Sequence, residues 1–77
     1  MNELQAKLEA QQIEARRVLN KAKLLNNREA IKFGTAALLK ASKSLDTIKK
    51  NTTTADEIQK DAERVDLYLK QADSALN

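Results

Sequence analysis

The side chains that most often act as catalytic bases and nucleophiles are missing from this chain of 77 residues. It has neither His nor Cys, so the commonest proton-transfer groups, thiolate nucleophiles and soft metal ligands are absent. The carboxylate pairs Glu57/Asp61 and Asp66/Asp73 are spaced one or two helical turns apart, but solvated acidic helix faces have the same spacing. We therefore expect a protein that is not an enzyme and that has no cofactor and no metal site.

Charge is distributed unevenly along the sequence. The net charge is +3, and residues 16–50 carry ten Lys or Arg against two acidic residues, whereas residues 51–77 carry three basic and six acidic residues. The two segments are expected to complement each other within one bundle. The alternative is that the basic segment attracts an anionic partner, in the extreme a nucleic acid. Phe33 is the only aromatic residue in this basic segment, so a series of aromatics to stack on bases is lacking, which disfavours single-stranded nucleic acid.

The elements that would position any site follow from the apolar pattern. Apolar positions recur at alternating spacings of three and four residues in three blocks, which begin at Leu4, Ile31 and Ile58. This alternation is typical of amphipathic helices packed lengthwise, and a chain with no Pro and one Gly favours helix. Because the predicted connections are short, consecutive helices should be antiparallel. The pattern predicts an all-α fold, an antiparallel three-helix bundle in a single domain over residues 1–77, with helices near 2–25, 28–50 and 55–76.

Polar residues mark the predicted helix boundaries. Residues 51–54 are Asn-Thr-Thr-Thr, which are poor helix formers, and Thr54 with Glu57 three residues later forms a capping-box pattern for the third helix. At the first boundary, Asn26 with Glu29 has the same spacing. The apolar stripes of the first two blocks differ in direction by roughly 140° at 100° per residue, so we expect a tight turn here instead of one continuous helix.

Specific residues are predicted to lie on the buried stripes. Gln11 interrupts the first stripe, and we expect it either to fix the helix register or to lie in solvent at the bundle end. Gly34 lies on the second stripe, where a packing reason for it is expected. The predicted stripes are Leu4, Leu8, Gln11, Ala15, Val18, Ala22 and Leu25; then Ile31, Gly34, Leu38, Ala41, Leu45 and Ile48; then Ile58, Ala62, Val65, Leu69, Ala72 and Leu76.

Four large apolar residues fall off these stripes. Ile13 and Leu24 lie about 170° from the first stripe, Leu39 about 130° from the second and Leu67 about 180° from the third. Single exposed leucines are ordinary on protein surfaces. Four of them on so small a surface indicate apolar grooves that accept another helix, from a partner or from a second copy of the chain.

Two stretches resemble the MIT domains, the microtubule-interacting and trafficking modules. Residues 64–73, RVDLYLKQAD, resemble the closing helix of that family, where the pattern is Tyr-Leu-x-Arg-Ala-Glu. Residues 29–38, EAIKFGTAAL, resemble its second helix. The sequence departs from the family at Gln71, Gly34 and Ala75, where Arg, Tyr and Leu are usual.

The resemblance implies a three-helix module that binds helical or extended tail peptides of ESCRT-III-type proteins beside the third helix, in membrane trafficking. It implies that Leu69, Ala72 and Asp73 line the peptide groove and that Asp73 pairs with a basic residue of the ligand.

Three hypotheses about function follow. The first is a non-catalytic protein–protein interaction module that binds a partner helix or tail peptide in a groove between helices. The second is a small homo-oligomeric helical bundle that assembles through the four off-stripe residues. The third is a nucleic-acid accessory protein that uses residues 16–50. No apolar run approaches the ~20 residues of a membrane span, and no secretory signal is visible, so a cytoplasmic protein is expected.

Overall fold

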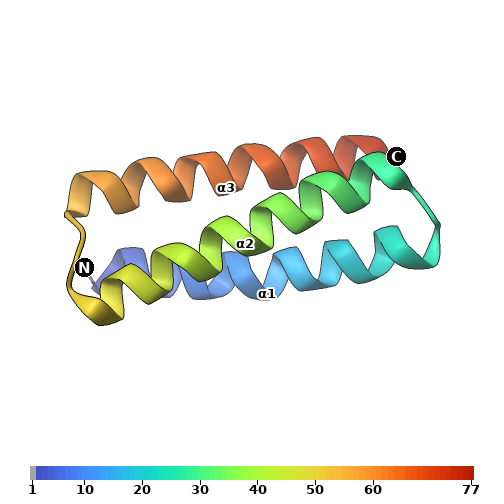
Figure 1. Ribbon diagram of the computed structural model, residues 1–77. Helices are drawn as coiled ribbons and strands as arrows, with labels where there is room; N and C mark the ends of the chain where they lie inside the picture. Colours follow the sequence, from blue (N-terminus) through green and yellow to red (C-terminus); the bar gives the residue numbers. More distant parts are fainter. Residues whose placement is uncertain (1) are drawn as a thin grey trace.

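The protein consists of three helices of similar length that lie side by side and are joined by two short turns. The computed structural model describes residues 2–77, and its helices are α1 (Asn2–Leu24), α2 (Arg28–Lys50) and α3 (Ala55–Leu76). Consecutive helices are antiparallel (Figure 1). The bundle measures 38 × 16 × 16 Å. The predicted antiparallel three-helix bundle is confirmed. The bounds of α2 and α3 match the prediction, and α1 ends one residue earlier than expected, at Leu24.

The turn between α1 and α2 uses two asparagines in different roles. Asn26 adopts a left-handed conformation with φ 53°, and the N–H groups of Asn26 and Asn27 donate to the carbonyls of Lys23 and Ala22. This is the helix-ending pattern in which a left-handed residue follows the last turn, and Asn tolerates it better than most residues. The side chain of Asn27 then accepts a hydrogen bond from the Ala30 N–H at 3.0 Å. The predicted N-cap at Asn26 is therefore wrong by one residue, because Asn26 is used to end α1.

The turn between α2 and α3 follows the same logic. Asn51 is left-handed with φ 55°, and its N–H donates to the Ile48 carbonyl. Thr54 is the N-cap of α3, as predicted, and its hydroxyl accepts from the Glu57 N–H at 3.2 Å. The Glu57 carboxylate accepts a hydrogen bond from the Thr53 hydroxyl at 2.8 Å, whereas a capping box would turn it to the Thr54 backbone. Thus half of the predicted capping box is present.

The two N-caps should contribute unequally to stability. Replacing Thr54 by Ala should lower the free energy of unfolding by about 1 kcal/mol, the usual cost of a lost N-cap. Asn27 also donates from Nδ2 to the Ala75 carbonyl at 2.8 Å, which ties the start of α2 to the end of α3. Replacing Asn27 by Ala should therefore cost about 2 kcal/mol, because a net hydrogen bond adds about 1. Urea denaturation measures both values, and equal losses would show that the Asn27–Ala75 bond contributes nothing.

The core is built largely from small side chains. In α1, Leu8, Ala15 and Ala22 are fully buried, and α3 buries the predicted stripe from Ile58 to Ala72, except that Leu69 is only half-buried. Leu25, predicted to be buried, is 57% exposed because it lies beyond the end of α1.

The buried stripe of α2 differs from the prediction. The helix buries Ala30, Gly34, Ala37, Ala41 and Ser44, while the predicted Leu38 and Leu45 are half-buried. The reason is the position of α2, which packs closely against both α1 and α3, whereas α1 and α3 contact each other less (Figure 1). The line of α2 that faces both neighbours admits only small side chains, and the larger apolar residues flank it.

Gln11 is buried in the interior, which answers the question left open by the sequence. It is only 6% exposed, and its Nε2 donates to the Ala62 carbonyl at 2.9 Å and to the Asp66 carboxylate at 2.7 Å. Lys7 reaches the same carboxylate at 3.4 Å. These bonds join α1 to α3 at one level of the bundle and satisfy the amide nitrogen of Gln11, whereas its buried Oε1 has no hydrogen-bond partner within residues 2–77. The expectation of a solvated Gln11 at the bundle end is wrong.

Candidate functional site

The residues that the MIT resemblance implies for a peptide groove do not form an open surface together. Leu69 is half-buried and packs against the core, Ala72 is fully buried, and Asp73 is exposed. Ala72 therefore cannot line an open groove, because it belongs to the buried stripe of α3. The peptide groove that the resemblance implies stays a prediction.

Asp73 lies on the α1/α3 side of the bundle, opposite basic side chains of its own chain. It lines a cavity of about 190 Å³ together with Arg17, Val18 and Lys21. The guanidinium of Arg17 donates from Nε to the Glu14 carboxylate at 3.1 Å. This bond and the charge of Glu14 raise the pKa of Arg17 above its usual value, with a smaller contribution from the charge of Asp73. A basic ligand residue would have to compete with these cations for Asp73.

The four off-stripe apolar residues are exposed, as expected, but they do not meet. Their exposed fractions run from 45% for Leu67 to 87% for Leu24. Leu39 lies two residues from both Ala37 and Ala41, which places it about 160–200° round α2 from the buried stripe. Ile13 and Leu67 likewise lie opposite the buried stripes of α1 and α3. These residues therefore point outward from three different helices and share no single groove.

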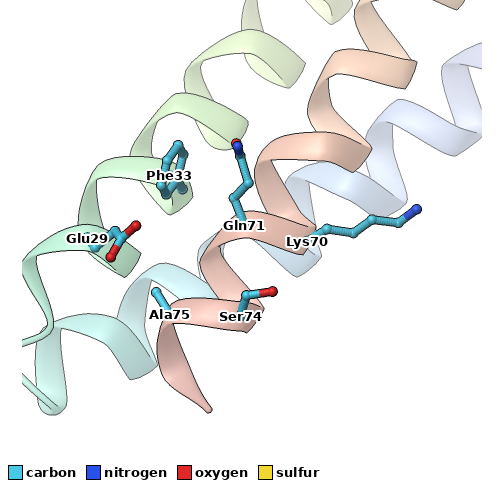
Figure 2. Close-up of a pocket in the computed structure, with 6 residues that line it drawn as sticks. All are labelled: Glu29, Phe33, Lys70, Gln71, Ser74 and Ala75. Atoms are coloured by element: carbon cyan, nitrogen blue, oxygen red, sulfur yellow. The ribbon is translucent and has the colours of Figure 1, made fainter.

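The two aromatic residues of the chain lie on one face, between α2 and α3. Phe33 and Glu29 of α2 line an open cleft of about 330 Å³ with four residues of α3, which are Lys70, Gln71, Ser74 and Ala75. Figure 2 shows Phe33 and Gln71 projecting from facing helices toward the same space. Tyr68 precedes Gln71 by three residues and Ala75 by seven, so it lies on the same side of α3. We call the surface that carries Phe33, Tyr68, Gln71 and Ala75 the α2/α3 face.

A polar cluster closes the other end of the α2/α3 face. The Ser44 hydroxyl donates to the Asp61 carboxylate at 2.8 Å, and the Lys40 ammonium lies 3.5 Å from the same carboxylate. The cluster borders a second cavity, of about 310 Å³. Its further lining residues are Lys43, Thr47, Thr52, Thr53 and Glu57. Two hollows therefore flank the central part of the face.

Unpaired cations surround this central part. The Lys32 ammonium lies over the Phe33 ring, 5.6 Å from its centroid, and Arg64 precedes Tyr68 by one helical turn. Lys32, Lys43 and Arg64 form no ion pair within residues 2–77, while the nearby Asp61 is already engaged by Lys40. The α2/α3 face thus combines aromatic surface with cations that form no ion pair, alongside the carboxylates of Glu29 and Glu57 that line its two hollows.

The chain matches no protein-family model, no curated protein and no solved structure. The MIT resemblance accordingly stays a prediction based on the quoted residues. In the part of the chain that the structure describes, no group of three or more acidic residues is gathered to hold a metal ion. The same part contains no helix with the length and apolar character that crossing a bilayer requires.

Sequence reasoning overlooked the α2/α3 face because part of the α2 stripe was predicted one residue too far along the chain. The missing signal was present in the sequence. Phe33 and Lys40 are seven residues apart, as are Tyr68 and Ala75, and each pair therefore occupies one side of its helix. Because the small residues of α2 face the interior, both pairs lie next to the contact between α2 and α3.

Proposed function

We propose that the chain is a non-catalytic module that binds another protein and that its α2/α3 face holds an acidic amphipathic helix or tail of that partner. The observation that supports this most is that one face carries two aromatic side chains, Phe33 and Tyr68, together with three cations. These cations have no ion-pair partner in residues 2–77.

The chemistry of the face matches such a ligand in two respects. Aromatic residues supply large apolar contact area with little loss of side-chain freedom, and they often dominate binding energy in interfaces. The cations Lys32, Lys43 and Arg64 would attract and orient carboxylates that flank the apolar side of the ligand. Ala36, half-buried three residues after Phe33, is a small side chain on α2 near this surface. An apolar side chain of the ligand would fit beside it.

The α1/α3 side, where Asp73 lies, is less suited to an acidic ligand, whereas the MIT resemblance implies a basic ligand residue at Asp73. This side presents Asp66 and Asp73, and both already lie near basic residues of α1. A trafficking role through a tail peptide, and a cytoplasmic location, remain part of the proposal.

A synthetic peptide tests the proposed face. The probe is a labelled peptide of about 20 residues with Leu at i, i+3, i+4 and i+7 spacing and Glu at the remaining positions, the pattern of an acidic amphipathic helix. We expect measurable binding by fluorescence anisotropy. Phe33→Ala should weaken it about 30-fold, since loss of an aromatic anchor costs about 2 kcal/mol. The double variant K32E/K43E should weaken it further and reduce its dependence on salt.

Matched controls distinguish this face from its alternatives. Asp73→Lys should leave peptide binding unchanged, whereas a groove on the α1/α3 side requires it to change binding. A peptide with Lys in place of Glu should not bind. A single-stranded oligonucleotide of equal charge is the third control, because tighter binding to it would favour the nucleic-acid hypothesis. Equal binding of the acidic and basic peptides would refute the proposed α2/α3 site.

A further inference from the structure

The outer face of α1 carries apolar side chains that the bundle does not use. Of the three helices, α1 is the least amphipathic, because it has apolar residues on both of its sides. Ala6, Ala10, Ile13 and Leu24 are all exposed. Their positions fall on one stripe with spacings of three and four residues, interrupted by Arg17 and Asn20, on the side opposite to the buried stripe. We call this stripe the outer face of α1.

Ile13 occupies the centre of this helix. Eleven residues of α1 precede it and eleven follow it, and it is 69% exposed. A two-fold axis at Ile13 would therefore place two copies of α1 side by side and antiparallel. The two helices would overlap along their whole length, about 34 Å at 1.5 Å per residue. The small side chains of Ala6 and Ala10 would let the two helix axes approach closely.

The charges of α1 select the antiparallel direction. The half that precedes Ile13 carries Glu3, Lys7 and Glu9, and the half that follows it carries one acidic and four basic residues. The basic residues are Arg16, Arg17, Lys21 and Lys23. Antiparallel packing places each basic half against the acidic half of the other copy, whereas parallel packing would place the two basic halves together.

One pair of charges makes this match specific. Glu9 and Arg16 are seven residues apart and thus lie on the same flank of the outer face. Both are exposed, and neither forms an ion pair within residues 2–77. Around an axis near Ile13, Glu9 of one copy falls opposite Arg16 of the other, and symmetry repeats the pair. Glu9 and Arg16 are therefore available to form ion pairs between two antiparallel copies of α1.

We propose that the protein forms an antiparallel homodimer through the outer face of α1, with Ile13 at the two-fold axis and Glu9–Arg16 pairs on either side. The α2/α3 face contains no residue of α1, so it stays open in the dimer. The dimer proposal and the peptide-binding proposal can therefore be tested independently of each other.

Sedimentation equilibrium tests the apolar part of this interface. The unmodified chain should pass from monomer to dimer between about 1 and 300 μM, because association follows mass action. Ile13→Asp should weaken the dimer at least about 30-fold, since it places a carboxylate at the centre of the interface. Leu39→Asp is the matched control, because Leu39 is 65% exposed on α2, and it should have no effect. A chain that stays monomeric throughout, or equal weakening by both variants, would overturn the proposal.

A charge exchange tests the antiparallel arrangement. Glu9→Arg and Arg16→Glu should each weaken the dimer, because each places like charges opposite one another twice. The double variant E9R/R16E re-forms both pairs and should recover most of the affinity. Circular dichroism checks that every variant keeps its helices, and the acidic-peptide assay should give the same result for all of them. If the double variant dimerises no better than the single ones, the antiparallel pairing is wrong.

Discussion

Replacing Ile58 by Ala should lower the free energy of unfolding by about 2–5 kcal/mol, the usual range for truncating a buried Ile. The side chain is fully buried, in the same apolar cluster as Leu8 and Val65. Much of the rest of the core is alanine, so few large side chains can move to fill the space. A chain of this length has a total stability of about 4–12 kcal/mol at 0.05–0.15 kcal/mol per residue, so the loss is a large fraction of the whole.

A second variant in the same helix provides the comparison. Leu67 is 45% exposed on the outer side of α3, and Leu67→Ala should change stability by less than about 0.5 kcal/mol. Urea denaturation followed by circular dichroism gives both values under identical conditions. Similar losses for the two variants would mean that Ile58 is not part of a close-packed core.

Replacing Gly34 by Leu should also be damaging, at about 3 kcal/mol or more, the upper part of the range for overpacked cores. A Cβ atom built on Gly34 would lie 3.3 Å from the Cα of Leu19 and 3.4 Å from its Cβ. The nearest obstacle is the backbone of α1, which cannot rotate aside. A longer side chain would therefore push α1 and α2 apart along their contact.

Alanine at the same position separates crowding from helix propensity. Gly34→Ala should stay within about 1 kcal/mol of the original chain, because the gain of about 1 kcal/mol in helix propensity offsets a tight methyl contact. Thermal unfolding followed by circular dichroism measures both substitutions. A Gly34→Leu variant that melts at the original temperature would show that the two helices do not approach closely at this point.

The architecture could be predicted from the sequence because periodicity and capping residues agreed. Thr54 showed where α3 begins, and the α2 bounds followed from the polar residues on either side. Of the buried stripe of α2 only Gly34 and Ala41 were predicted, because periodicity favours large side chains, such as Leu38 and Leu45. Which residues of α2 are most buried depends on the packing of both α1 and α3 against this helix. The local sequence of α2 does not encode that packing.

The candidate site was less predictable than the fold. The exposure of Ile13, Leu24, Leu39 and Leu67 followed from their angles round each helix. Their separation onto different sides depends on how the helices are rotated within the bundle. The surroundings of Asp73 likewise depend on α1, since Arg17 and Lys21 are more than fifty residues away in sequence.

Tyr68 gives the molecule a built-in optical reporter. It is the only tyrosine, and the chain has no tryptophan, so near-ultraviolet emission comes almost entirely from this one half-buried phenol on the α2/α3 face. A ligand without tyrosine or tryptophan that docked there would alter the emission intensity directly, whereas pairing of two α1 helices on the far side would leave it unchanged. Unlabelled protein could thus distinguish the two association events in a single spectrometer.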